Sequence, residues 1–153
     1  EAVLENKIAE YDAFLTKQDP AFTVEELEEA MQKVMDQYAG GIGTHYQFNE
    51  KQLAMAEEKI KKLQILAKGL AAADMHELMF IYELKERLTV CLTVIAHLRA
   101  RKETRWHSFA ENLDYPEKSD AWLCYLNSKK NGDQITMIRR DLVKGGETYE
   151  HRD

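Results

Sequence analysis

The longest apolar stretch of the chain, residues 75–99, places the strongest constraint on how it can fold. Its apolar residues repeat at the three- and four-residue spacing of a helix. One set comprises Leu78, Ile81, Leu84, Leu88, Cys91, Ile95 and Leu98, and a second begins with Met79, Tyr82, Val90 and Val94. A helix with two apolar faces is expected to be buried from two sides. The stretch therefore predicts a central helix, which Asp74 can cap with Glu77 three residues on.

Two further helices are predicted before this one. Thr23 and Asn49 stand at N-cap positions, and each is followed three residues later by Glu or Gln, the spacing of a capping box. Their apolar stripes comprise Val24, Leu27, Met31, Val34, Met35 and Tyr38, and then Leu53, Ala56, Ile60, Leu63, Leu66, Ala67 and Leu70. The first is expected to end at Gly40-Gly41, because glycine can take the left-handed conformation that closes a helix. Short connections then predict a three-helix bundle over residues 20–106, with the last two helices antiparallel.

A separate short helix is expected at the N-terminus. Its apolar residues, at steps of four and three, are Leu4, Ile8, Tyr11 and Leu15. Asp19-Pro20 breaks the pattern, because proline disfavours helical geometry in the residue before it. Residues 1–19 are therefore interpreted as an N-terminal helix and linker.

The C-terminal part has a different pattern. Residues 122–126 and 134–141 are rich in strand-forming side chains, and Asn131-Gly132 between them is a hairpin signal within a polar loop. Residues 107–143 are interpreted as a turn and a β-hairpin appendix, and residues 144–153 as a flexible tail. Two strands alone are marginally stable, so the hairpin must lie on the helices or on a partner. The fold class is thus mainly all-α: a three-helix bundle with an extra N-terminal helix and a C-terminal β-hairpin.

Composition and motifs exclude several functions. The formal net charge of −6 argues against a nucleic-acid binder, and no apolar run is long enough to span a bilayer. Two cysteines, Cys91 and Cys124, make no disulfide framework, so a cytoplasmic location is expected. The glycines at 40–43 match no phosphate-binding motif, and His76 and His97 have no metal-ligand spacing. We therefore expect no catalytic, cofactor-binding or metal-binding residue in the chain itself.

A charged segment with the sequence Arg-Lys-Glu-Thr-Arg-Trp, residues 101–106, follows the central helix directly. One interpretation is local: Arg99, Arg101, Lys102 and Arg105 can complement the negative end of the helix dipole. The other is that alternating charges and a large aromatic side chain form a surface that meets another surface. Residue chemistry leaves both interpretations open.

This segment, with Asp-Tyr-Pro at 114–116 and Trp-Leu at 122–123, resembles the C-terminal helical domain of the succinate dehydrogenase and fumarate reductase flavoprotein family. Trp106 after the second arginine, together with the sequences at 38–42, 49–51 and 70–78, resembles the adenylylsulfate reductase alpha subunits within that family. The resemblance covers roughly residues 23 to 142.

The resemblance implies a longer parent enzyme that binds flavin adenine dinucleotide (FAD). Such an enzyme reduces adenylylsulfate to sulfite and AMP beside an iron–sulfur beta subunit. The resemblance also implies that the flavin-binding domain and its substrate-binding residues lie upstream, so this chain would be inactive when isolated. Its start without Met agrees with an excised domain. What the resemblance implies for this chain is a packing role. The residues expected to face the flavin domain, with their charges paired across the contact, are Arg101, Lys102, Glu103, Arg105 and Trp106.

Two alternatives remain at this point. The parent enzyme can be a fumarate reductase or succinate dehydrogenase-like flavoprotein, which would share the same bundle. The chain can also be a free-standing helical protein-interaction module. A large apolar patch beside Trp106 would favour a domain of a flavoprotein, and a fully polar surface would favour the module.

Overall fold

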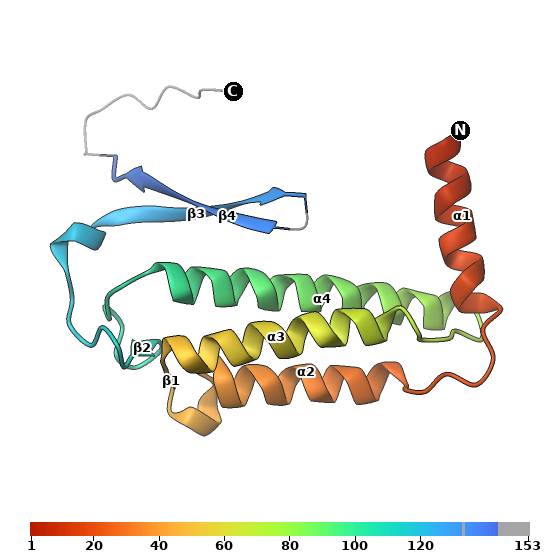
Figure 1. Ribbon diagram of the computed structural model, residues 1–153, viewed down its shortest axis with the longest axis horizontal. Coiled ribbons are helices and arrows are strands. Elements are labelled where there is room, and N and C mark those ends of the chain that lie inside the picture. Colours follow the sequence, from red (N-terminus) through yellow and green to blue (C-terminus); the bar gives the residue numbers. More distant parts are fainter. Residues whose placement is uncertain (133, 144–153) are drawn as a thin grey trace.

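A computed structural model describes residues 1–132 and 134–143, and the predicted tail at 144–153 lies outside them. The long helices are α1 (Ala2–Leu15), α2 (Val24–Tyr38), α3 (Glu50–Ala67) and α4 (Met75–Ala100). The hairpin comprises β3 (Cys124–Asn131) and β4 (Gln134–Asp141). The short elements are η1 (Ile42–Thr44), β1 (Gln47–Phe48), β2 (Glu111–Asn112) and η2 (Asp120–Trp122). The predicted mainly-α fold with a C-terminal hairpin is confirmed (Figure 1).

The three bundle helices begin at the predicted caps. Thr23 Oγ1 accepts a hydrogen bond from the Glu26 amide at 3.2 Å, and the Glu26 carboxylate accepts one from the Thr23 amide at 2.9 Å. Asn49 forms the same reciprocal pair with Gln52, at 2.9 and 3.1 Å. Asp74 Oδ1 accepts hydrogen bonds from the amides of His76 and Glu77 in the first turn of α4. Each cap satisfies a helix amide that would otherwise lack a partner and contributes about 0.5–2 kcal/mol of stability.

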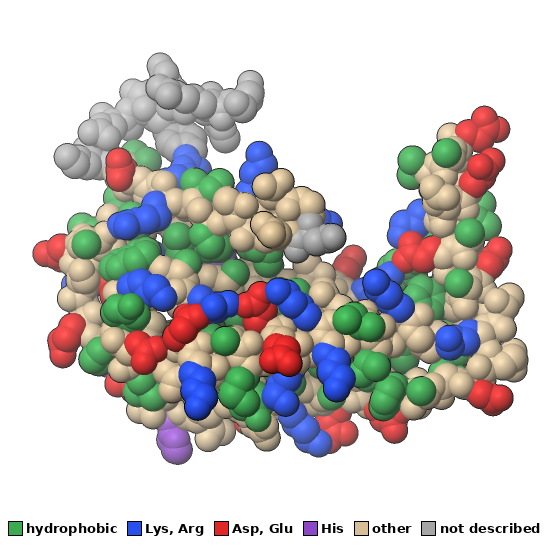
Figure 2. Space-filling model, in the orientation of Figure 1, with side chains coloured by type: hydrophobic (Ala, Val, Ile, Leu, Met, Phe, Trp, Pro, Cys, Tyr) green, Lys and Arg blue, Asp and Glu red, His purple; other side chains and the backbone are tan. Residues whose placement is uncertain are grey.

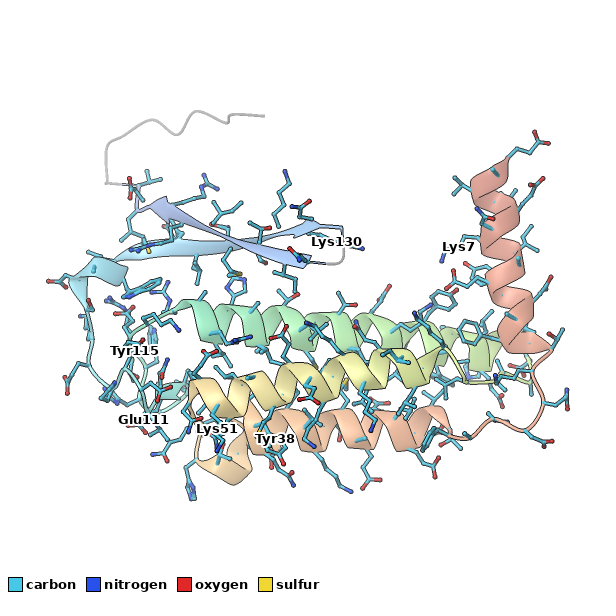
Figure 3. All side chains as sticks on the ribbon, in the orientation of Figure 1. Lys7, Tyr38, Lys51, Glu111, Tyr115 and Lys130 are labelled. Carbon is cyan, nitrogen blue, oxygen red and sulfur yellow. The ribbon has the colours of Figure 1, made fainter. Side chains whose placement is uncertain are left out.

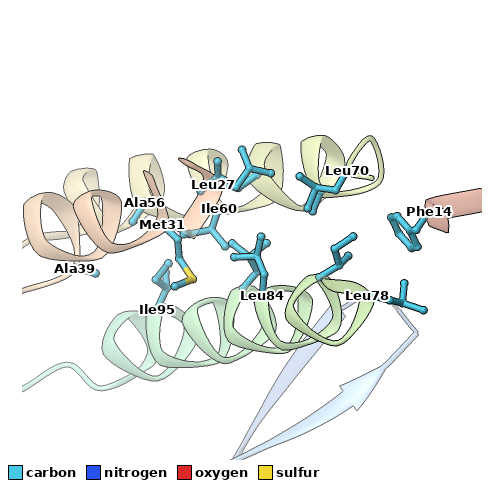
Figure 4. Close-up of a cluster of buried hydrophobic side chains, with 14 of the residues drawn as sticks. Phe14, Leu27, Met31, Ala39, Ala56, Ile60, Leu70, Leu78, Leu84 and Ile95 are labelled. Carbon is cyan, nitrogen blue, oxygen red and sulfur yellow. The ribbon is translucent and has the colours of Figure 1, made fainter. Parts of the chain in front are cut away.

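The core lies between α2, α3 and α4, and α4 runs antiparallel to α3 (Figures 1 and 4). The fully buried large aliphatic side chains are Leu53, Ile60, Leu70, Ile81, Leu84, Leu88 and Ile95. α2 ends as predicted, with Gly40 at a φ of 74°. A side chain at this position would meet both the strained backbone and the ring of Phe48.

The second apolar face of α4 is covered only in part, so the prediction of burial from two sides is wrong for most of it. Tyr82 is half-buried against Tyr11 of α1, with the two ring centres 5.4 Å apart. Met79, Val90 and Val94 are 46%, 60% and 41% exposed. The reason is geometric: α2 and α3 both pack on the first face, whereas α1 and the hairpin each cover only part of the rest of the helix (Figure 1).

α1 stands at a steep angle to the bundle and projects away from it (Figure 1). Its predicted stripe is only half covered: Tyr11 and Leu15 pack against the core, whereas Leu4 is 65% and Ile8 49% exposed. The residue that joins the buried cluster is Phe14, which the predicted stripe did not contain (Figure 4).

The strand β4 has the predicted bounds, whereas β3 is longer, and the connection between them tighter, than predicted. Cys124 pairs with Asp141, and the ladder continues to Asn131 opposite Gln134, with Gly132 at a φ of 60°. Trp122 belongs to η2 and not to the strand. Half-buried side chains alternate with exposed ones over the first four residues of each strand, and Tyr125 and Ile138 are among the exposed residues. One face of the hairpin is therefore turned toward the helices.

Candidate functional site

The candidate site lies at the end of the bundle where α4 stops and α3 begins. Here β1, in the link between α2 and α3, pairs in parallel with β2, so that Gln47 lies opposite Glu111. Gln47 Nε2 also donates to Glu111 Oε2 at 2.9 Å. The pairing fixes the segment after α4 against the start of α3, where Figure 3 shows Glu111 and Tyr115. Strands of two residues carry no recognisable sequence pattern, so this pairing was not predicted.

Glu103 is the centre of the charged segment, and its carboxylate is completely buried. Its Oε1 accepts hydrogen bonds from Arg101 Nη1 at 2.7 Å and Arg105 Nε at 3.0 Å. Its Oε2 accepts from Arg105 Nη2 at 2.9 Å and from the Ser119 amide at 3.0 Å. Four donors thus surround one buried carboxylate. We call these four residues, Arg101, Glu103, Arg105 and Ser119, the Glu103 clamp.

The clamp keeps its carboxylate ionised. Burial by itself raises the pKa of Glu103, but the hydrogen bonds from Arg105, the Ser119 amide and Arg101 outweigh burial and lower that pKa to about 2. A buried charge is tolerated when it is both paired and hydrogen-bonded, as it is here.

Both arginines also bind the chain that follows. Arg101 donates to the carbonyl oxygens of Trp122, at 2.9 Å, and Cys124, at 3.1 Å. Arg105 donates to the carbonyl oxygen of Ser119 at 3.2 Å. These bonds tie η2 and the start of β3 to the end of α4.

This geometry corrects two expectations. The Glu103 charge was expected to pair across a contact with another domain, but it pairs within the chain with Arg101 and Arg105. The local interpretation by the helix dipole does not describe the contacts either. The described bonds of these two arginines go to Glu103 and to later carbonyls, while Arg99 pairs with Glu50 and Glu57 on α3.

Thr104 is fully buried next to the clamp. Its hydroxyl accepts from the Asn112 amide at 2.9 Å and donates to the Tyr115 carbonyl oxygen at 2.9 Å. It therefore fixes the Asp-Tyr-Pro turn, which lies eleven positions further on. Its small polar side chain gave no sequence signal of this role.

Lys102 also contacts its own chain. Its Nζ lies 3.7 Å from Glu50 Oε2 and 5.3 Å from the centre of the Tyr115 ring. Beside it, between α3, α4 and β4, is a depression of about 540 Å³ whose wall includes Arg99, Glu50 and Glu57. Arg99 forms ion pairs with both glutamates, and Lys61 and Lys102 each pair with one of them, so neither carboxylate is left without a cation.

Trp106 differs from the residues before it, because its side chain is 67% exposed. Phe109, whose amide donates to the Trp106 carbonyl oxygen at 2.9 Å, is 68% exposed. The rings of Phe109 and Tyr46 lie 6.4 Å apart. We call Tyr46, Trp106 and Phe109 the aromatic edge. Sequence reasoning assigned only Trp106 to a docking surface. Phe109 joins it through a local turn, and Tyr46 joins through the β1–β2 pairing.

Within residues 1–132 and 134–143 no group of His, Cys, Asp or Glu side chains is arranged to hold a metal ion. In the same part of the chain, no helix has the length and apolarity needed to cross a membrane. Cys91 and Cys124 are both free and half-buried.

Comparisons with known proteins give a consistent set of relatives. The family model for the C-terminal part of the fumarate reductase flavoprotein matches residues 28–147. The chain is 33% identical over 98 residues to the adenylylsulfate reductase subunit alpha of Megalodesulfovibrio gigas, covering 63% of this chain and 15% of that protein.

Solved structures extend this similarity over nearly the whole chain. Adenylylsulfate reductase from the hyperthermophile Archaeoglobus fulgidus matches 97% of this chain with a TM-score of 0.87 and 31% identity, and the match is 26% of that chain. A second reductase of adenosine-5-phosphosulfate, solved as a covalent adduct with sulfite, matches 84% of this chain and 21% of its own, with a TM-score of 0.78 and 36% identity. E. coli quinol fumarate reductase shares the fold at 19% identity, with a TM-score of 0.74 over 98% of this chain and 27% of its own. The chain thus spans 15–27% of the length of these relatives.

Proposed function

The chain belongs to the family of fumarate reductase flavoprotein C-terminal domains, and on this basis we propose that it is the C-terminal domain of an adenylylsulfate reductase alpha subunit. The observation that carries the proposal is the match to the Archaeoglobus reductase, at 31% identity over 97% of this chain. The match to the fumarate reductase covers as much of the chain, but its 19% identity supports a shared fold alone.

In this proposal the whole subunit binds FAD and reduces adenylylsulfate to sulfite and AMP in the cytoplasm. The reaction takes up two electrons and breaks the bond between sulfur and the oxygen of the AMP phosphate, so that this oxygen leaves with AMP. An iron–sulfur beta subunit supplies the electrons. We expect the described residues to take no part in this chemistry and the domain to contribute structure to the subunit.

That contribution is to present a rigid surface to the flavin-binding domain. Trp106 and Phe109 expose large apolar areas, which a protein normally covers when a partner is available. The Glu103 clamp and the β1–β2 pairing hold this edge without using an external charge. We therefore keep the predicted docking segment and assign its residues different roles. Trp106 makes the contact, while Arg101, Lys102, Glu103 and Arg105 position it.

The experiment that tests the proposal is purification of the native polypeptide that contains this sequence. The expected polypeptide is several times longer than 153 residues, carries a flavin absorbance band and releases sulfite and AMP from adenylylsulfate when a reductant is supplied. A native polypeptide without flavin would contradict the proposal and would favour the free-standing interaction module. Flavin together with fumarate reduction would assign the other branch of the family.

A further inference from the structure

The exposed half of α1 is an apolar surface that the rest of the described chain does not cover. Leu4 and Ile8 lie one helical turn apart and are 65% and 49% exposed. We call them the outer stripe of α1. The same stripe continues into the core through Tyr11 and Leu15. The outer stripe is therefore the continuation of a packed surface beyond the end of the bundle, and in Figure 2 this end of α1 stands clear of the other elements.

α1 is held firmly in this projecting position. Phe14 is buried in the core, and its carbonyl oxygen accepts a hydrogen bond from the Ala72 amide at 3.0 Å. Glu10 lies 2.6 Å from Lys85 of α4 and 2.7 Å from Lys7. The helix is thus anchored at its base by both apolar and charged contacts.

The comparison with the Archaeoglobus reductase indicates that the projecting helix is a shared feature. That match covers 97% of this chain at a TM-score of 0.87, too much of the chain for α1 to be left out. Only 26% of the Archaeoglobus chain is matched, so about three quarters of it lies outside the region that this chain represents. A helix that leaves its own bundle with an apolar stripe needs a partner, and the unmatched part of the same subunit is the partner that this comparison supplies.

We propose that the outer stripe of α1 packs into an apolar groove of the flavin-binding part of the same subunit. This inference rests on the proposed function. It names a second contact between the two parts, at the opposite end of the bundle from the aromatic edge. The two contacts together would hold α4 against the flavin-binding part at both of its ends.

The test is site-specific photocrosslinking in the full-length subunit. The substitution Leu4→p-benzoylphenylalanine places a photoreactive group on the outer stripe. Asn6→p-benzoylphenylalanine is the matched control, because two positions along a helix rotate a side chain by about 200°. Asn6 is also exposed. After irradiation, peptide mass spectrometry identifies the residues to which each position is joined.

We expect Leu4 to crosslink to residues of the flavin-binding part of the same polypeptide, with a yield at least about tenfold above that from Asn6. Crosslinking to a second copy, or to the beta subunit, would overturn the proposal by identifying a different occupant. Crosslinking no stronger than from Asn6 would overturn it by showing that the stripe faces solvent.

A parallel variant, Ile8→p-benzoylphenylalanine, provides the answer if the first does not fold. The flavin absorbance of the same preparation reports on the proposed function independently. A subunit without flavin would contradict the function, whereas a flavin-containing subunit without the crosslink would contradict only the α1 contact.

Discussion

At one end of the bundle, the β3–β4 hairpin is tied to α4 around a buried carboxylate, whereas at the other end α1 is held by one buried aromatic ring and by a partly exposed ion pair. Glu103 has a fully buried carboxylate, while the side chain of Glu10 is 35% exposed. The pKa of each carboxyl is lowered by its cationic partners. The comparison teaches that the same kind of ion pair contributes differently to stability at the two ends, because water screens the pairs of Glu10 and weakens their effect on its pKa.

The largest expected effect comes from removing the buried carboxylate. Glu103→Ala leaves Arg101 and Arg105 without their carboxylate partner and removes the acceptor of the Ser119 amide, which weakens the attachment of η2 to the end of α4. We expect a loss of about 3 kcal/mol in the free energy of unfolding, the lower end of the range for a broken buried pair, because both arginines reach solvent. Urea denaturation of the wild type and of Glu103→Ala measures this loss.

The matched control for this change is Glu29→Ala, which removes an exposed partner of Lys33. Its expected change is below about 0.5 kcal/mol. If Glu103→Ala costs no more than this control, the clamp does not hold the two regions together.

The next largest effect is expected in the pH dependence of the free energy of unfolding, to which Glu103 should contribute more than Glu10. The ordinary pKa of Glu is 4.5 and that of folded Glu103 is about 2, so the unfolded chain binds the proton first as the pH falls. The stabilisation is therefore complete above pH 4.5 and is lost as the pH falls toward about 2. Between about pH 5 and about pH 3 we expect Glu103 to account for a loss of about 2 kcal/mol.

Glu10 should contribute much less over the same pH window, below about 1 kcal/mol, because its pairs with Lys7 and Lys85 are partly exposed. Urea denaturation of the wild type, Glu103→Gln and Glu10→Gln at both pH values gives the comparison. Equal flattening of the pH dependence by the two variants would remove the distinction between the two ends.

The ion pair at the base of α1 should show a small coupling. In a double-mutant cycle of Glu10→Ala and Lys85→Ala, we expect a coupling free energy of about 0.2–1 kcal/mol that decreases when salt is added. A coupling above about 2 kcal/mol would show that this pair acts like a buried one. Phe14 would then not be the main anchor of α1.

The smallest effect on stability is expected at the aromatic edge. Trp106→Ala should change the free energy of unfolding of the 153-residue chain by less than about 0.5 kcal/mol, because Trp106 is 67% exposed. The same change should weaken the contact with the flavin-binding part in a full-length subunit, which limited proteolysis can detect.

The other tryptophan provides the control for Trp106. Trp122 is partly buried, and the guanidinium carbon of Arg139 lies 4.3 Å from the centre of its ring. Trp122→Ala should therefore cost more than Trp106→Ala. The reverse order would place Trp106 in the core.

Local interactions explain which parts of the fold were predictable. The caps at Thr23, Asn49 and Asp74 are hydrogen bonds between residues two or three positions apart, so a short stretch of sequence contains both partners. The apolar spacing of α3 and of the first face of α4 likewise identified the buried side chains. The charged segment at 101–106 was singled out as the functional region, and only Trp106 within it proved to be strongly exposed.

The remaining features depend on partners that are distant in the sequence. Glu103 is turned inward because the Ser119 amide, sixteen positions later, and two arginines meet its carboxylate. Phe109 and Tyr46 become neighbours only when β1 and β2 pair. Leu4 is exposed because the N-terminal half of α1 projects from the bundle, whereas Phe14, near the C-terminal end of the helix, is buried. The sequence by itself determined the helices, their starting residues and the helix faces that form the core, because these depend on neighbours along the chain. The tertiary structure alone decided which charges are buried and which apolar residues remain exposed, because burial depends on what packs against a residue in space.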